Sequence, residues 1–485
     1  MLWLLVIPGA IFVFLAVILI RTLVFRPPAP EAREIDEIGV DAGQTLDRLS
    51  RMIRCRTVSS TEEHLTDRAE FEKFLALLPE LYPNVHKTCD AERMGASGIL
   101  YTFRGESSAA PVVFMSHYDV VPADEEAWDR PAFEGTIERA GGSGGSDVLW
   151  GRGTLDTKST LCGIMEAAES LIKQGFVPEN DLYFAFSGDE EITGETAPAM
   201  VEELRNRGIA PVMVLDEGGA VVEGVFPGVS QACALIGTAE KGLLVAELSV
   251  ETGGGHASMP PPHTPVGVLA RAVTRIEKKP FRTRLTPPVA AMFDTLGRHS
   301  TLTYRLIFAN LWCFMPVLGA ICKKRGGELN AILRTTCAFT MMEGSKATNV
   351  LPPVAKMSAN LRIIGGETPG GAIAYMESVA KDPDIKFRNV YGMDPSPDSF
   401  ADGVGWEALK EAIMLTWPGV LVSPYLMFAC SDSRHYCDIC DRVYRFSAMM
   451  LSKEERATIH GHNERITADS LVKIVQFYTR LMSRC

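Results

Sequence analysis

The sequence lacks features that are typical of several classes of protein, among them nucleic-acid-binding and disulfide-rich proteins. Basic residues are in deficit, because 48 Lys and Arg stand against 60 Asp and Glu, which gives a formal net charge of -12. This deficit argues against a nucleic-acid partner, since binding to phosphates needs clustered positive charge. The sequence also contains no Asn-x-Ser/Thr glycosylation site and no repeat with a period of about 20–50 residues.

A disulfide framework is missing as well. The 11 cysteines are odd in number and follow no framework spacing in a chain of 485 residues, which is long enough to bury a core without cross-links. Cys437 and Cys440 form a C-x-x-C, but no second pair at zinc-finger spacing accompanies them, so buried thiols are favoured over a structural zinc. With 46% hydrophobic and 22% charged residues, the composition is that of a globular enzyme.

An uninterrupted apolar run opens the chain. Leu2 to Ile20 carries no charge, and its helical length of about 28 Å is enough to cross the hydrocarbon core of a bilayer. A cleaved signal peptide is the alternative, but the first basic residues come after the run rather than before it. We therefore expect a membrane localisation, with residues 1–26 as a single-pass anchor and 27–46 as a linker. The flanking arginines favour a cytoplasmic catalytic domain, although the side of the membrane stays open.

Beyond the linker, short apolar runs alternate with segments of helical periodicity. Strands are predicted at 112–115, 182–186 and 212–215, and helices at 157–174 and 196–207. This rhythm predicts an α/β sheet with helices on its faces.

The pattern changes near residue 240 and resumes near residue 366. The later predicted strands are 243–250, 356–363, 385–390 and 443–446, and the later helices are 369–379, 405–417 and a terminal helix from Thr467. We therefore divide the soluble chain into a first catalytic part (47–239), an inserted domain (240–365) and a second catalytic part (366–485).

Five clusters of imidazole and carboxylate groups stand where this pattern ends a strand or begins a helix. They contain His117 and Asp119, then Asp156, then Glu190 and Glu191, then Asp216 and Glu217, and finally His460. Each cluster alone has a simpler explanation as a loop histidine, a helix N-cap or a solvated acidic turn. Together they should meet at the edge of the sheet where α/β proteins bind ligands, and they offer the donors that divalent metals prefer.

The order of these clusters resembles a known family. The motifs are H-x-D-V-V-P at 117–122, G-R-G-x-x-D-x-K at 151–158, D-E-E at 189–191, D-E-G at 216–218 and H-x-x-N-E at 460–464. The set resembles the di-zinc peptidases that include aminoacylases, carboxypeptidase S and succinyl-diaminopimelate desuccinylase. It is most similar to the branch of carboxypeptidase S and N-fatty-acyl-amino-acid hydrolases. The resemblance implies a central mixed sheet with helices on both faces, interrupted by an inserted α+β lid or dimerisation domain.

The resemblance also implies two Zn²⁺ per chain and a role for each matching residue. By this resemblance, the first zinc is bound by His117, which Asp119 orients, and by Glu217 or Asp216. The second zinc is bound by Glu191 and His460, and Asp156 bridges both ions. Glu190 is the general base. Glu217 is preferred over Asp216 because the aminoacylase pattern uses its glutamate, and Asp216 stays open.

Three more residues receive roles from the resemblance. His256 and Asn349 of the inserted domain would donate hydrogen bonds to the oxyanion, and Arg434 would bind the free carboxylate of the substrate. In this family the histidine often comes from the partner subunit, which implies a homodimer.

The uncharged segment Leu306–Cys322 leaves two alternatives. It is either a second membrane span or a buried or membrane-facing helix of the inserted domain, and we favour the second because Asn310 and Pro316 interrupt the run. An apolar wall of this kind beside an anchored active site suits a lipophilic acyl substrate.

The predicted activity is hydrolysis of a peptide or N-acyl amide bond next to a free carboxylate, on a small molecule or a short peptide. N-fatty-acyl amino acids are the alternative substrates. A di-zinc aminopeptidase is disfavoured by the carboxylate-binding motif around Arg434, and a binding protein with a dead site is disfavoured because every implied ligand and the base are present.

Overall fold

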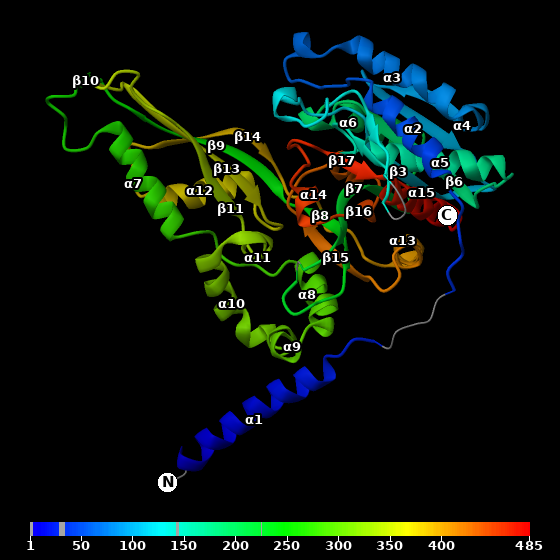
Figure 1. Ribbon diagram of the computed structural model, residues 1–485. Helices are drawn as coiled ribbons and strands as arrows, with labels where there is room; N and C mark the ends of the chain where they lie inside the picture. The colour runs from blue at the N-terminus through cyan, green and yellow to red at the C-terminus, as the bar shows by residue number, and fades with distance from the viewer. Residues whose placement is uncertain (1–2, 29–33, 142–144, 225) are drawn as a thin grey trace.

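Two sheets of different size organise the molecule (Figure 1). The computed structural model describes residues 3–28, 34–141, 145–224 and 226–485. The first two residues of the predicted anchor and residues 29–33 of the predicted linker lie outside the described residues.

The large sheet is mixed, in agreement with the predicted fold class. Its strands lie in the order β1 (Asp90–Met94), β2 (Gly98–Phe103), β6 (Asn180–Ser187), β3 (Ser107–His117), β7 (Met213–Val222), β16 (Val443–Met450), β8 (Cys233–Glu240) and β15 (Leu421–Met427). The central strands β6, β3, β7 and β16 are parallel, whereas β1 and β2, β2 and β6, and β16 and β8 pair antiparallel. Because parallel strands end at one edge of a sheet, the residues after β3 and β6 lie close together.

Helices cover both faces of this sheet because its central strands are apolar on both sides. In β3, Phe114 packs into the core shared with α5 and α15, while Val113 and Met115 face the opposite side, where α6 packs. The helices of this part are α2 (Ala42–Ile53), η1 (Glu63–Leu65), α3 (Arg68–Leu81), α4 (Pro83–Thr88), η2 (Glu125–Ala127), α5 (Lys158–Lys173), η3 (Glu190–Ile192), α6 (Thr196–Asn206), α13 (Gly403–Thr416), η4 (Asp432–Asp438), α14 (Lys453–Arg456) and α15 (Ala468–Met482).

The smaller sheet is antiparallel and carries two helices on one face. Its strands are β11 (Thr336–Glu343), β13 (Val354–Ile363), β9 (Gly242–Glu251) and β14 (Lys386–Met393), in that order, and its helices are α7 (Pro265–Lys278) and α12 (Pro369–Ala380). The predicted division at residue 365 differs from this arrangement, because β14 pairs with β9 and α12 packs on the same sheet.

The remaining strands form two small sheets. A three-stranded sheet contains β17 (Arg465–Thr467), β5 (Val148–Trp150) and β4 (Thr136–Glu138), and a two-stranded ribbon contains β10 (Gly255–His256) and β12 (Val350–Leu351). Figure 1 shows β10 at the tip of the smaller sheet that points away from the large one.

A layer of helices lies below the two sheets in Figure 1. These helices are α8 (Pro287–His299), α9 (Leu302–Ala309), α10 (Leu311–Arg325) and α11 (Gly327–Ile332). The predicted apolar segment 306–322 therefore lies in two helices, which meet at Asn310 with a bend of 109°. Pro316 does not break the run as we expected, since it lies inside α10.

Helix α1 (Trp3–Val24) extends from the body of the molecule and contacts α9 (Figure 1). Its stretch Ile7–Val24 is long and apolar enough to cross a membrane. The length and composition of this helix fit an anchor and a signal sequence alike.

The predicted strands and helices of the alternating region are confirmed. Several boundaries differ, and the most important is that of β7, which continues from Met213 to Val222 and pairs with β8 near its end. Asp216 and Glu217 therefore lie within a strand rather than after one.

Candidate metal centre

His117 is the last residue of β3, and its ring is buried. Its Nδ1 lies 3.0 Å from the carbonyl oxygen of Asp119 and 3.3 Å from the Oδ1 atom of the same residue. Nε2 then faces two carboxylates, with Asp156 Oδ1 at 3.1 Å and Glu217 Oε1 at 3.2 Å. Asp119 thus fixes the orientation of the ring, as an outer carboxylate does for a metal-binding imidazole.

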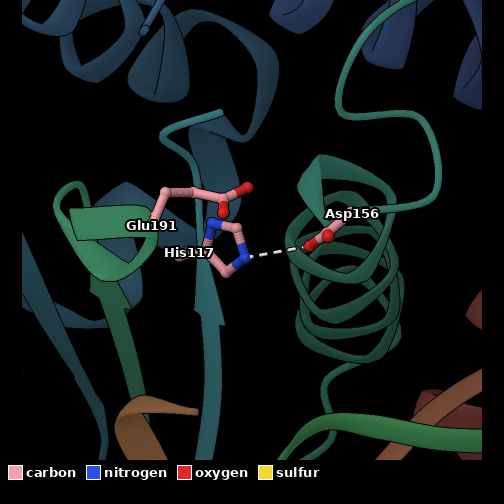
Figure 2. A group of neighbouring side chains, drawn as sticks. All are labelled: His117, Asp156 and Glu191. Atoms are coloured by element: carbon pink, nitrogen blue, oxygen red, sulfur yellow. Dashed lines mark hydrogen bonds and ion pairs between the residues drawn. The ribbon is translucent and has the colours of Figure 1, made fainter. Parts of the chain in front are cut away.

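Asp156 lies between two imidazoles. It precedes α5 and points toward the ring of His117, as Figure 2 shows. Its Oδ1 lies 3.1 Å from His117 Nε2, and its Oδ2 lies 3.0 Å from His460 Nε2. The same His460 nitrogen lies 3.2 Å from Glu191 Oε2. Asp156 therefore presents one oxygen to each of two imidazole groups.

Glu190 and Glu191 form the turn that follows β6. Their backbone N–H groups donate to the carboxylate of Asp119 at 3.2 and 3.1 Å. Asp119 consequently positions this turn as well as His117. The Glu190 carboxylate stands apart from the ring, because its Oε2 lies 3.9 Å from His117 Nε2, beyond hydrogen-bond distance.

The pair Asp216 and Glu217 is separated by the alternation of the strand. Neighbouring side chains in a strand point to opposite faces. Glu217 faces His117, whereas Asp216 Oδ2 accepts the backbone N–H of Ser433 at 3.1 Å and is buried. Of the two residues that the sequence left open, the geometry favours Glu217.

The titration of these groups reflects their mutual contacts. Hydrogen bonds with Asp156 and Glu191 raise the pKa of His460 to about 10. Burial opposes the charged form of His117, but the charge of Glu217 and hydrogen bonds with Asp119 and Asp156 outweigh it and raise its pKa well above the usual value. Burial also raises the pKa of Glu217 to about 8, with help from the charge of Asp156. The carboxylates of this cluster lie close enough together that a cation between them would stabilise their charged forms.

The donor set fits a divalent metal. Two groups bring ligand atoms within 4.8 Å of one another, His117 with Asp156 and Glu191, and His117 with Glu190 and Glu217. Glu191 Oε1 is buried and makes no hydrogen bond within the described part of the chain, so it is free to coordinate. Imidazole nitrogen and carboxylate oxygen are the ligands that zinc and related metals take in proteins.

The sequence motifs included Glu464, but we assigned it no role. It is fully buried and pairs with Arg152 at 2.7 Å. Its Oε1 accepts the backbone N–H groups of Gly153, Leu155 and Asp156 at 3.1, 2.7 and 3.2 Å. Glu464 therefore holds the loop that carries Asp156. Its place at the end of the His460 motif was the available signal.

Replacement of Glu464 with alanine should lower the free energy of unfolding by about 3–5 kcal/mol, because Arg152 would remain buried without its partner. Thermal unfolding of the detergent-solubilised full chain measures this effect. Glu454 is exposed on α14, and Glu454→Ala is the matched control, expected within about 0.5 kcal/mol of the wild type. A loss no larger for Glu464→Ala than for the control would refute this role.

Two further contacts of the site were absent from the sequence prediction. Ser59 Oγ donates to Asp119 Oδ2 at 2.7 Å, and Ser187 Oγ donates to Asp432 Oδ2 at 2.6 Å. Burial raises the pKa of Asp432 to about 8. Serines carry no recognisable signal in a sequence, because only the tertiary fold brings them to these carboxylates.

Three residues with roles assigned by resemblance lie elsewhere in the chain. His256 and Asn349 are exposed beside each other at the tip of the smaller sheet, where Ala257 N–H donates to the Asn349 carbonyl at 3.0 Å (Figure 1). Arg434 lies 3.4 Å from Glu240 and donates to the carbonyl oxygen of Asp394. None of the three contacts His117 or Asp156 in the described part of a single chain.

The large mixed sheet and the segments around it bring two imidazoles and several carboxylates together, a donor set that fits a divalent metal. The chain belongs to the peptidase family M20/M25/M40, whose model matches residues 113–484. It is accordingly a hydrolase that uses metal.

Two relatives illustrate the range of this family. The chain is 34% identical to the N-fatty-acyl-amino acid synthase/hydrolase PM20D1 of Xenopus tropicalis, over 97% of this chain and 92% of that protein. It is 32% identical to the probable carboxypeptidase S-like 2 of Dictyostelium discoideum, over 96% of this chain and 91% of that protein.

Solved structures share the fold. The M20 family metallo-carboxypeptidase Sso-CP2 of Sulfolobus solfataricus matches with a TM-score of 0.65 and 15% identity, over 90% of this chain and 98% of that one. The YXEP protein of Bacillus subtilis, described as a dinuclear metal binding peptidase, matches with a TM-score of 0.55 and 12% identity, over 91% and 98% of the two chains.

Proposed function

We propose that this enzyme uses two Zn²⁺ per chain to hydrolyse a peptide or N-acyl amide bond next to a free carboxylate. One observation carries the proposal. Asp156 presents its two oxygens to His117 and His460, each of which also faces a further carboxylate, Glu217 or Glu191. His117 and Glu217 would hold one ion, His460 and Glu191 the other, and Asp156 both.

The residues around such a pair of ions would have separate roles in the reaction. When bound, zinc lowers the pKa of a water molecule and polarises a carbonyl group. Glu190 accepts the proton of the attacking water and delivers it to the leaving amine nitrogen. Burial raises the pKa of Glu190 well above its ordinary value. Asp119 keeps both His117 and the Glu190 turn in place.

The oxyanion requires hydrogen-bond donors, and in the described part of one chain His256 and Asn349 do not contact the imidazole cluster. His256 and Asn349 are exposed at the distant tip of the smaller sheet, which suits donation to the site of a second copy in a homodimer. Arg434 would bind the substrate carboxylate after exchanging its present contacts with Glu240 and Asp394 for the ligand.

N-fatty-acyl amino acids are the second candidate substrates. The name of the Xenopus tropicalis relative, an N-fatty-acyl-amino acid synthase/hydrolase, supports them. The carboxypeptidase S-like relative supports peptides instead.

We also propose that α1 anchors the enzyme in a membrane. Ile7–Val24 has the length and hydropathy of a span, and 11% of it is buried against the rest of the molecule. Burial this low suits a helix that lies in lipid rather than in a protein core.

A substrate panel tests the proposed activity. N-oleoyl-phenylalanine, glycyl-leucine and the methyl ester of each compound are offered to the purified full chain. We expect turnover of the free acids and loss of at least tenfold in kcat/KM for the esters, because one lost interaction with a charged partner costs about 1.5–3 kcal/mol. Exclusive turnover of glycyl-leucine would eliminate the fatty-acyl candidate. Equal turnover of acids and esters would contradict carboxylate recognition.

A further inference from the structure

Helices α9 and α10 form a bent pair that rests against α1. Asn310, at the bend, is fully buried, and its Nδ2 donates to the Ile18 carbonyl at 3.2 Å and to Thr22 Oγ1 at 3.2 Å. Arg21 Nε donates to the Ala309 carbonyl at 3.1 Å. Hydrogen bonds of this kind between polar side chains and backbone join helices inside membranes. The bend is therefore fixed to the C-terminal part of α1.

The chain directly after α1 is held by the same helical layer. The Arg298 guanidinium of α8 lies 4.6 Å from the centre of the Phe25 ring, and its Nη1 donates to the Arg26 carbonyl at 3.4 Å. The orientation of α1 relative to α8, α9 and α10 is thus set by contacts on both sides of its C-terminus. The helical layer therefore keeps a fixed position relative to the C-terminal end of α1.

Helix α10 is apolar on two faces, but only one of them packs against the large core. Its packed face contains Leu311, Met315, Leu318 and Cys322, which contact the large core. Its other face is exposed and contains Trp312, Pro316, Val317, Ala320 and Ile321. A helix at the surface of a soluble domain carries polar residues on its outer face. The apolar outer face of α10 is therefore unlike the surface of a helix that faces water.

One ring contact sets the depth of α10. The rings of Phe14 and Trp312 lie 5.7 Å apart, edge to face. Phe14 is ten residues before Val24, the end of α1, and ten helical residues are about 15 Å long. If Ile7–Val24 crosses a bilayer, Phe14 lies within the hydrocarbon layer, and Trp312 lies beside it. The far end of α10 carries Lys323, Lys324 and Arg325, which suit anionic headgroups.

We propose that α9 and the first turns of α10 dip into the bilayer beside α1, so that the exposed face of α10 contacts phospholipid. This proposal rests on the proposed anchor. It adds a second membrane-contacting element from the middle of the chain, and it places the helical layer between the membrane and the large sheet. The pair enters and leaves on the same side, because α9 and α10 meet at 109° and both continue into the soluble body.

A photocrosslinking experiment tests the proposal on the full chain. p-Benzoyl-phenylalanine replaces one residue at a time in protein reconstituted into vesicles of phosphatidylcholine and phosphatidylglycerol, and adducts are identified by mass. The test positions are Trp312 and Val317. Phe12, exposed on α1, reports on the anchor, and Val404, exposed on α13 of the catalytic part, is the matched control.

We expect phospholipid adducts at positions 12, 312 and 317, several-fold above those at position 404. Adducts at position 12 but not at 312 and 317 overturn the proposal and leave the anchor intact. Adducts at none of these positions overturn the proposal and the anchor together. Crosslinks from 312 or 317 to a second protein chain instead of lipid also overturn it, and assign the exposed face to self-association.

Discussion

Replacement of Glu190 with glutamine should lower kcat by about 10²–10⁴-fold while metal content stays unchanged. The amide keeps the size of the side chain but cannot accept the proton of the attacking water. Glu190 Oε2 lies 3.9 Å from His117 Nε2. The carboxylate is therefore near the cluster but makes no hydrogen bond to this imidazole. Steady-state kinetics and metal analysis on the same preparation measure both quantities.

Asp189 provides the matched control for this substitution. It is the preceding residue, and its Oδ2 accepts the hydroxyl of Thr196 at 2.8 Å rather than facing the imidazoles. Asp189→Asn should therefore keep kcat within a few-fold of the wild type. Wild-type activity in Glu190→Gln, or loss of metal from it, would remove Glu190 from the role of general base. If Glu190→Gln kept both full activity and wild-type metal content, another group would have to accept the proton of the attacking water.

Replacement of Asp156 with asparagine should weaken metal binding by more than about 100-fold and abolish activity. Loss of an outer-shell partner already costs about 10–100-fold in metal affinity, and Asp156 presents an oxygen to both imidazoles. An amide offers only one oxygen and directs an N–H₂ group at one of the two cation positions. Metal content after dialysis and hydrolysis rate are the readouts.

Asp294→Asn is the control for the Asp156 substitution. Asp294 lies on α8 and pairs with Arg298 at 2.9 Å, far from the imidazoles in the fold, so metal content and rate should stay at wild-type values. Two metal ions retained in Asp156→Asn would contradict the bridging role, whatever the activity of the variant.

The strand ends of the large sheet could be predicted because local patterns encode them. An apolar run followed by an acidic or histidine cluster identified the ends of β3 and β6, and the periodicity of α5 placed Asp156 before its first turn. The choice between Asp216 and Glu217 could not be made in this way. It depends on which face of β7 points to His117, and β7 continues through both residues.

Long-range pairing accounts for most of what the sequence did not predict. The strand β8 (Cys233–Glu240) contains small and polar residues and shows neither alternation nor a long apolar run, although every residue in it is buried. The assignment of β14 to the smaller sheet depends on its pairing with β9, far away in the chain. Glu464 acquires its contacts only when the last part of the chain returns to the Asp156 loop.

The residues around His256 do not indicate where it lies relative to the imidazole cluster, and only the resemblance implied that it serves a partner subunit. The motif around His256 indicated a donor to the substrate, but the fold places the residue at the exposed tip of the smaller sheet. A motif specifies the chemistry of a group, whereas the subunit that receives it depends on assembly.

The most direct test of the account is to remove metal from the purified full chain with a chelator and to return Zn²⁺ in measured steps while hydrolysis is followed. We expect negligible activity in the stripped enzyme and a rise to a plateau at two zinc ions per chain. Full activity in protein shown to be free of metal would contradict this expectation.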